Sequence, residues 1–302
     1  MTRGFFTIAT GDIGYYKMAF HLLESFRLFH PNEPFAILCD EENAYTKAFS
    51  KTVLLENPSR TFTDKFFMLT HCPYDENIFI EPDCLVYHDL NHFWDLLSAD
   101  YDVSSFGWND TFVEFFSDPV YAAKKFLGGT DKLLPLFTPG YLFIRKGDVA
   151  RKVYGDAIRI LSEIRDDPKL NNDPRIVCGK AIRDDPIFFF AMALNGCFCA
   201  AKPNEGKCVS LPGVEKIEKI SLSRGILNVV WHEPMENCSI LHFSSRRAKE
   251  EGLYLQQITV LRLLRNGKRS GFLLSLAESK PFGLLLDLFK KITVRIKRIS
   301  GR

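Results

Sequence analysis

The sequence predicts an α/β protein built on a mostly parallel sheet. Short apolar runs that suit buried strands alternate with segments whose apolar residues recur at helical spacing. The expected strands are 5–9, 35–40, 52–55 and 78–80, and the expected helices are 15–29, 41–49 and 63–69. Strands that alternate with helices in this way are joined by right-handed crossovers. Because no Gly/Ser-rich linker divides the first 245 residues, we expect one large domain over 1–250 and a helical tail over 251–302.

Each element has a local justification. The first strand reads Phe-Phe-Thr-Ile-Ala, and the helix after it continues to a His-Pro-Asn stop. The second strand ends in an acidic turn, and the helix over 63–69 has Thr63 or Asp64 near its start as a cap. Ligands of such sheets bind at the carboxyl ends of the strands, where residues 10–12 and 81–83 are expected.

Composition favours a well-packed globular protein, with 27 Phe among 302 residues. A net charge of +2 provides no field for nucleic acid, so no nucleic-acid partner is expected. No apolar stretch approaches the ~20 residues of a membrane-spanning helix, and the residues before the first strand are too few for a signal peptide. The eight cysteines lack C-x-x-C spacing, which favours reduced thiols in a cytoplasmic protein.

The pair Glu81 and Asp83 directly follows the apolar strand 78–80. In an extended chain, residues two apart point the same way. Two carboxylates about 4 Å apart repel by ~4 kcal/mol at an effective dielectric near 20. A divalent cation that also binds phosphate oxygens would remove this repulsion. A solvated acidic turn that ends the strand explains the same residues.

The surroundings of this pair resemble the D-x-D motif of nucleotide-sugar glycosyltransferases with the GT-A fold, here in the form E-x-D. Four segments match in the family's order over residues 5–245. They are the first strand with Thr10-Gly11-Asp12, the K-F-x-x-L segment that begins at Lys65, the acidic pair, and the Ile-Leu-His-Phe run that contains His242. The resemblance is closest to family 8, the glycogenin and bacterial galactosyltransferase type. It implies a Rossmann-like, mostly parallel twisted sheet flanked by helices.

The resemblance implies a Mn²⁺ or Mg²⁺ ion bound by Glu81, Asp83 and His242. Two carboxylates, an imidazole and phosphate oxygens suit either metal. A lone histidine in a strand is more often structural, and that interpretation of His242 stays open.

Six further positions are implied to contact the nucleotide sugar. They are Thr10, Asp12, Tyr15 (with Tyr16 as the alternative), Lys65, Gly140 and Arg246. Gly140 ends a Thr-Pro-Gly turn where the family usually has Asn-Ser/Thr-Gly, so an asparagine contact is missing, and an ordinary turn explains it too. Arg246 stands where the family has a lysine that contacts the diphosphate. Arg247 and Lys249 are alternatives for that role, as is a solvated basic turn.

Asp184 and Asp185 precede the helical run 187–194. They resemble the family's acidic element that faces donor or acceptor hydroxyls, which makes them the candidate catalytic residues. A helix cap is the alternative explanation.

The function implied is transfer of a sugar from a nucleotide diphosphate sugar, with a UDP-sugar favoured, to a glycan or lipid-linked acceptor. No strong carboxylate nucleophile is evident, so the family implies a front-face retaining route. A degenerate GT-A domain that binds a nucleotide sugar without turnover is one alternative. A metal-dependent nucleotidyltransferase is another, although residues 10–12 lack the basic phosphate loop of that class.

The C-terminal residues 283–302 read as a basic amphipathic helix. Apolar residues recur at helical spacing from Leu285 to Ile299, and six cations but no acid follow Asp287. Such a helix suits an anionic membrane surface. We therefore expect peripheral attachment to the inner face of the plasma membrane, close to a lipid-linked acceptor. A helix packed on the main domain with a solvated basic face is the alternative.

Overall fold

The computed structural model describes residues 1–111, 116–137, 140–179, 181–244, 252–267, 271–279 and 281–286. The chain forms two compact units, each assembled from separate stretches of sequence. The first unit comprises Met1–Phe20, Asn32–Pro82 and Leu90–Gly206, and the second comprises His21–Pro31, Asp83–Asp89 and Lys207–Arg302. Glu81 thus belongs to the first unit and Asp83 to the second. The predicted boundary at residue 250 stays a prediction.

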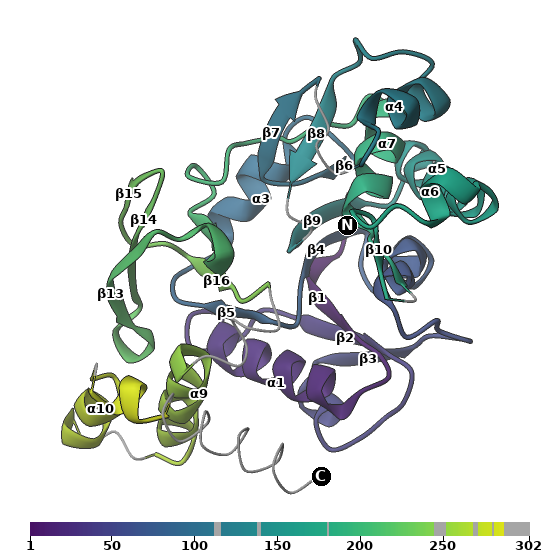
Figure 1. Cartoon of the computed structure of the whole chain (residues 1–302). Coiled ribbons are helices and arrows are strands. Elements are labelled where there is room, and N and C mark those ends of the chain that lie inside the picture. The colour runs from purple at the N-terminus through teal and green to yellow at the C-terminus, as the bar shows by residue number, and fades with distance from the viewer. Residues whose placement is uncertain are drawn as a thin grey trace, which may run out of the picture. The chain divides into compact units, whose positions relative to one another are not determined.

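A six-stranded sheet with the order β3-β2-β1-β4-β9-β6 organises the first unit (Figure 1). Its strands are β1 (Arg3–Ala9), β2 (Phe35–Cys39), β3 (Lys51–Leu54), β4 (Glu76–Ile80), β6 (Val103–Ser104) and β9 (Tyr141–Arg145). The first four are parallel to one another, and β9 pairs antiparallel with β4 and with β6. The predicted α/β class with a mostly parallel sheet is confirmed.

Helices of the first unit supply much of its core. They are α2 (Met68–His71), α3 (Asn91–Ser98), α4 (Pro119–Leu127), α5 (Asp148–Asp166), α6 (Pro168–Asn171) and α7 (Asp185–Leu194), while α1 (Ile13–Arg27) begins in this unit and ends in the second. Helix α7 contacts α4 and α5 (Figure 1). Its Phe188 and Phe190 are buried against aromatic rings of η2 (Phe62–Phe67) and α4. Each such buried side chain contributes roughly 1.5–3 kcal/mol of hydrophobic stabilisation, which holds α7 against η2 and α4. The unit also contains two short pairs of strands. In one, β7 (Gly107–Asp110) pairs with β8 (Leu134–Phe137), and in the other β10 (Val177–Cys178) pairs with β11 (Ala181–Ile182).

Two predicted helices differ from the structure. Of 41–49 only the 3₁₀ turn η1 (Thr46–Ala48) is helical, because the Asn43 side chain accepts from the backbone N–H groups of Tyr45 and Thr46 and so competes with the helix. The helix over 63–69 begins as the 3₁₀ segment η2 and continues as α2. Its cap is Thr61, whose side chain accepts from Thr63 N, so the predicted caps Thr63 and Asp64 are wrong.

The second unit contains two three-stranded sheets. One has the order β12-β16-β5, with β12 (Cys208–Ser210), β16 (Ile240–His242) and β5 (Cys84–Val86). The other is antiparallel and consists of β13 (Lys216–Ser221), β14 (Ile226–Trp231) and β15 (Glu233–Met235), with η3 (Leu211–Gly213) before it and η4 (Leu222–Arg224) within it. Helices α9 (Gly252–Arg265) and α10 (Gly271–Ala277) follow, and residues 281–286 are also helical. Most of the predicted amphipathic helix, residues 287–302, lies outside the described residues.

Candidate functional site

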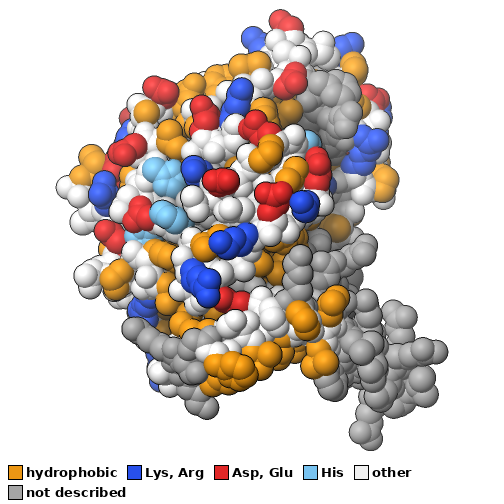
Figure 2. All heavy atoms as spheres, turned by 90° about the vertical axis from the view of Figure 1, so that its left-hand side faces the viewer, with side chains coloured by type: hydrophobic (Ala, Val, Ile, Leu, Met, Phe, Trp, Pro, Cys, Tyr) orange, Lys and Arg blue, Asp and Glu red, His pale blue; other side chains and the backbone are white. Residues whose placement is uncertain are grey.

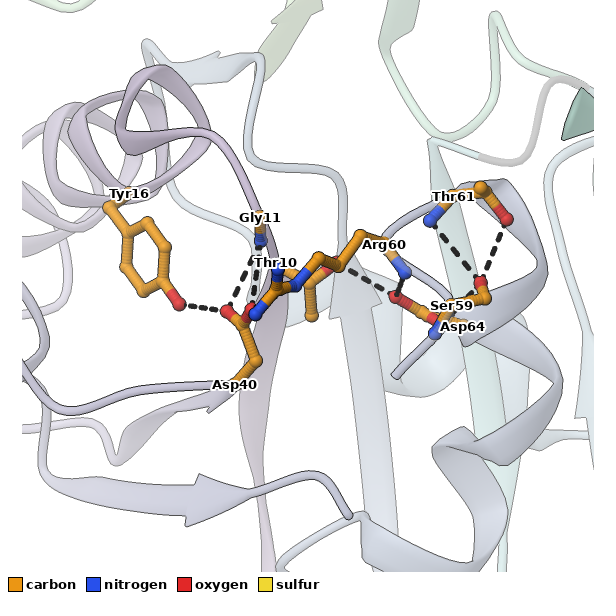
Figure 3. A network of polar contacts seen from close by, with 8 residues as sticks. All are labelled: Thr10, Gly11, Tyr16, Asp40, Ser59, Arg60, Thr61 and Asp64. Atoms are coloured by element: carbon orange, nitrogen blue, oxygen red, sulfur yellow. Dashed lines mark hydrogen bonds and ion pairs between the residues drawn. The ribbon is translucent and has the colours of Figure 1, made fainter. Parts of the chain in front are cut away.

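The loop after β1 is held by a buried carboxylate at the end of β2. Gly11 adopts a positive φ of 79°, which turns the backbone so that its N–H points to Asp40, 3.2 Å from each carboxylate oxygen. The Tyr16 hydroxyl also donates to Asp40, and Arg60 Nε donates to it at 2.9 Å (Figure 3). These donors lower the pKa of Asp40 although burial acts to raise it. Asp40 therefore stays ionised and fixes the loop.

A second carboxylate, Asp64, fixes the same loop from the other side (Figure 3). Its Oδ1 accepts from Ser59 N at 2.6 Å, and its Oδ2 accepts from Arg60 N at 2.9 Å and from Thr10 Oγ1 at 2.8 Å. From the sequence, Asp64 was expected only as a helix cap, and Asp40 and Arg60 were not predicted as site residues. The acidic turn after the second strand was the available signal for Asp40.

The predicted nucleoside-binding residues lie on this loop and in the first turn of α1. Thr10 is oriented by Asp64, and the Asp12 carboxylate accepts from Gly14 N at 2.6 Å. Tyr15 is 41% exposed, whereas Tyr16 is fully buried. Burial and the Asp40 contact raise the pKa of Tyr16. Tyr15 is therefore the ring available to a ligand, while Tyr16 supports the loop.

Lys65 is buried between two carboxylates of the first unit. Its ammonium contacts the carboxylate of Glu81, the residue that directly follows β4. The ammonium also lies 2.8 Å from Asp184 Oδ2 at the start of α7. Burial acts to lower the pKa of Lys65, but Asp184 and Glu81 more than offset it and raise the pKa overall. Burial raises the pKa of Asp184, against the opposing effect of Lys65. One ammonium thus contacts two carboxylates.

Asp185 adjoins this cluster and pairs with Arg183. Burial, and then the charge of Asp184, raise its pKa to about 6. Asp184 stands at the N-cap position of α7 but its side chain makes no capping hydrogen bond, so its orientation comes from Lys65. Gly140 lies beside the same strand end, since Glu81 N donates to its carbonyl at 2.9 Å. Residues 138 and 139 of that turn lie outside the described part of the chain.

The second unit brings three potential metal ligands together. Asp83, Cys84 and His242 are buried, and one ligand atom of each lies within 4.8 Å of the others. The antiparallel register of β16 with β5 places His242 opposite Cys84. His242 Nε2 lies 3.1 Å from Asp83 Oδ1, and Phe243 N donates to the Asp83 carbonyl at 2.9 Å. A short strand pair therefore joins residues that are far apart in sequence.

This donor set fits a divalent ion of intermediate hardness. Carboxylate oxygen and imidazole suit Mn²⁺, and the Cys84 thiol adds a soft donor that favours Zn²⁺. Tyr254 of α9 lies close enough to the group for the charge of Asp83 to act on it. Burial, and then that charge, raise the pKa of Tyr254. Cys84 was not predicted as a ligand, because in the sequence it belongs to the apolar run 84–86 and resembles an ordinary buried strand residue. Of the predicted ligands, Asp83 and His242 lie together, whereas Glu81 is held by Lys65. Arg246, with Arg247 and Lys249, falls in residues 245–251, outside the described residues.

Comparison with known proteins identifies the fold. No protein-family model and no curated protein matches the sequence. Among solved structures, the chain is similar to the galactosyltransferase LgtC in complex with donor and acceptor sugar analogs. The TM-score is 0.51 and the sequence identity is 13%, and the match covers 81% of this chain and 88% of that chain. An active-site mutant of LgtC matches equally well. The bifunctional glycosyltransferase WbbM has a TM-score of 0.51 and 14% identity over 83% of this chain and 47% of its own. The chain has the GT-A fold.

The GT-A fold explains why these residues gather in the first unit. Thr10-Gly11, Asp40 and Glu81 each follow one of the adjacent parallel strands β1, β2 and β4. The carboxyl ends of such strands lie at one edge of the sheet, where α/β proteins bind their ligands. The GT-A fold predicted from the sequence is confirmed.

Proposed function

We propose that the chain is a glycosyltransferase that moves a sugar from a UDP-sugar to a glycan or lipid-linked acceptor. The observation that carries the proposal is the contact of Asp83 with His242 in a protein with the GT-A fold. A buried carboxylate is costly unless it is paired or bound to a cation. This pair, expected as metal ligands from the resemblance, lies in a group able to bind one.

Asp83 and His242 would hold a Mn²⁺ or Mg²⁺ ion. When bound, the ion supplies positive charge to the diphosphate leaving group as the glycosidic bond breaks. The family resemblance also implies Glu81 as a ligand, and in the structure the Lys65 ammonium contacts its carboxylate.

The remaining residues bind and orient the donor. Thr10, Asp12 and Tyr15 hold the nucleoside at the loop after β1 and the start of α1. Lys65, Gly140 and Arg246 contact the diphosphate or sugar. Asp184 and Asp185 face the sugar or acceptor hydroxyls as catalytic residues, and transfer follows a front-face route with retention. With a pKa of about 6, Asp185 exchanges a proton near neutral pH.

Titration calorimetry with UDP, with and without Mn²⁺, tests this function, followed by hydrolysis of a panel of UDP-sugars. We expect metal-dependent binding of UDP and slow hydrolysis of one donor. Binding without any turnover favours the degenerate GT-A domain. Preference for a nucleoside triphosphate favours the nucleotidyltransferase, and absence of nucleotide binding contradicts all three.

We also propose that the C-terminal part of the second unit docks on an anionic membrane. Among the described residues, no helix is both long and apolar enough to cross a bilayer. Large apolar side chains are nevertheless exposed on α10 and residues 281–286, and Figure 2 shows hydrophobic side chains toward the bottom of the face where α10 lies. They are Phe272 (75% exposed), Leu276 (49%), Leu284 (71%) and Leu285 (51%). Contiguous exposed apolar surface marks an interaction site, and the six cations that follow in sequence suit anionic lipid.

Polar contacts join the segment that carries these apolar side chains to the rest of the second unit. Gln256 of α9 donates to the carbonyls of Ala277 and Ser279. Glu278 accepts from Ser221 Oγ at 2.8 Å and from Ser223 N at 3.0 Å. These polar contacts fix α10 to the second unit while Phe272 stays exposed.

Sedimentation with phosphatidylglycerol vesicles measures this docking. We expect binding that weakens as salt rises, because the attraction is screened. Phe272→Ser combined with Leu284→Ser should weaken it by roughly tenfold or more, since two apolar side chains no longer enter the lipid. Val120→Ser, at a 51% exposed position in the first unit, is the matched control. If the intact chain does not bind vesicles at low salt, the membrane proposal is wrong and these apolar side chains serve for packing within the protein.

A further inference from the structure

The Arg60 side chain lies over the loop at which the nucleoside is expected. Figure 3 shows it reaching across Thr10 and Gly11 to Asp40. A Cβ atom built on Gly11 would lie 3.2 Å from Arg60 Cβ and 3.5 Å from its Cδ. Although its Nε is bound to Asp40, the side chain is 66% exposed. Arg60 is therefore the solvent-facing cover of this loop.

The backbone of Arg60 adopts a conformation that arginine disfavours. Its φ is 59°, in the left-handed region that glycine adopts freely. Asp64 holds it there by accepting from Arg60 N at 2.9 Å. The ion pair joins a largely exposed guanidinium to Asp40, whose carboxylate also accepts from Gly11 N and the Tyr16 hydroxyl, so the pair itself stabilises the fold little. Stability does not account for an arginine here, and such an outlier in a ligand-binding edge points to function.

The local charge indicates which part of a nucleotide sugar fits. Asp40 contacts the guanidinium of Arg60 and Asp64 accepts from its backbone N–H, so two carboxylates adjoin one cation and the group disfavours phosphate. Within the described part of the chain, Nε is the guanidinium nitrogen with a hydrogen-bond partner, and both Nη groups stay available. A guanidinium plane stacks on an aromatic ring and donates to acceptors at its edge. A nucleobase offers both without adding negative charge.

We propose that Arg60 binds the base of the nucleotide sugar, an inference that rests on the proposed function. Arg60→Gly tests it, because glycine suits the observed φ and thermal unfolding should show a protein at least as stable. Affinity for UDP and for UMP, measured by calorimetry, should fall by the same factor of about ten. Binding of pyrophosphate with Mn²⁺ should not change.

Asn57→Gly is the matched control, since Asn57 is exposed in the same segment with a φ of 51°. It should leave all affinities unchanged. If the unaltered chain binds UDP and Arg60→Gly binds it equally well, the inference is wrong and the proposed function stands. If affinity for pyrophosphate falls together with that for UDP, Arg60 binds phosphate and not the base. If the unaltered chain binds no nucleotide, both proposals fail.

Discussion

Replacing Asp83 by asparagine is expected to lower metal-stimulated transfer from a UDP-sugar by at least about a hundredfold. The substitution keeps the shape of the side chain but removes the negative charge that is proposed to bind the cation. Stabilisation of a leaving diphosphate by fixed charge accounts for factors of this size. The measurement is kcat as a function of Mn²⁺ concentration, together with thermal unfolding to verify the fold.

Two variants separate metal binding from a structural pairing of Asp83 with His242. His242→Ala should raise the Mn²⁺ concentration needed for half-maximal activity much more than it changes thermal stability. Cys84→Ser keeps a small side chain and should leave the Mn²⁺ dependence intact while weakening Zn²⁺ binding, because a hydroxyl is a harder donor than a thiol. Unchanged Mn²⁺ dependence in Asp83→Asn would remove Asp83 from the metal site.

The parallel strands could be predicted because each is a short apolar run whose burial requires no partner information. β1, β2 and β4 lie where the apolar residues of 5–9, 35–40 and 78–80 predict them. The absence of a full helix over 41–49 could not be predicted from the hydrophobic pattern. There the hydrogen bonds of the Asn43 side chain outweigh a weak helical periodicity. Local hydrogen bonds of this kind leave little trace in hydrophobic pattern.

The site was less predictable than the fold because its contacts join distant segments. The pairing of His242 with Asp83 depends on the register of β16 against β5, and only the family resemblance suggested it. Arg60 carries no motif, and the role proposed for it rests on its backbone angle and on its contacts with Asp40 and Asp64. Lys65 was expected at the ligand, and the structure adds that its charge is already shared by Glu81 and Asp184.

Lys65→Met is expected to destabilise the protein by about 3–5 kcal/mol. Removing one partner of a buried ion pair leaves an uncompensated buried charge, and here two carboxylates lose the same ammonium. Lys65 and Asp184 side chains are each 7% exposed, so water cannot replace the lost contact. Urea unfolding of the two proteins at one pH measures the difference in free energy of unfolding.

The loss should depend on pH with a defined sign. In the intact protein the pKa of Lys65 lies above its ordinary value of 10.5. The stability that the charged Lys65 contributes is therefore fully present below pH 10.5 and does not change between about pH 5 and about pH 8. In Lys65→Met the pKa of Asp184, already raised by burial, rises further. A carboxylate with a raised folded pKa contributes stability at low pH that is lost as pH rises through that pKa. Lys65→Met should therefore lose more stability near pH 8 than near pH 5.

Asp184→Asn is the matched control at the same cluster. It removes the carboxylate whose pKa burial raises and leaves Lys65 paired with Glu81, so we expect a small change in the free energy of unfolding and a weaker pH dependence. The two variants each change one charge at one place in the core and should move stability very differently. Equal losses in both, independent of pH, would mean that packing and not charge compensation holds this cluster together.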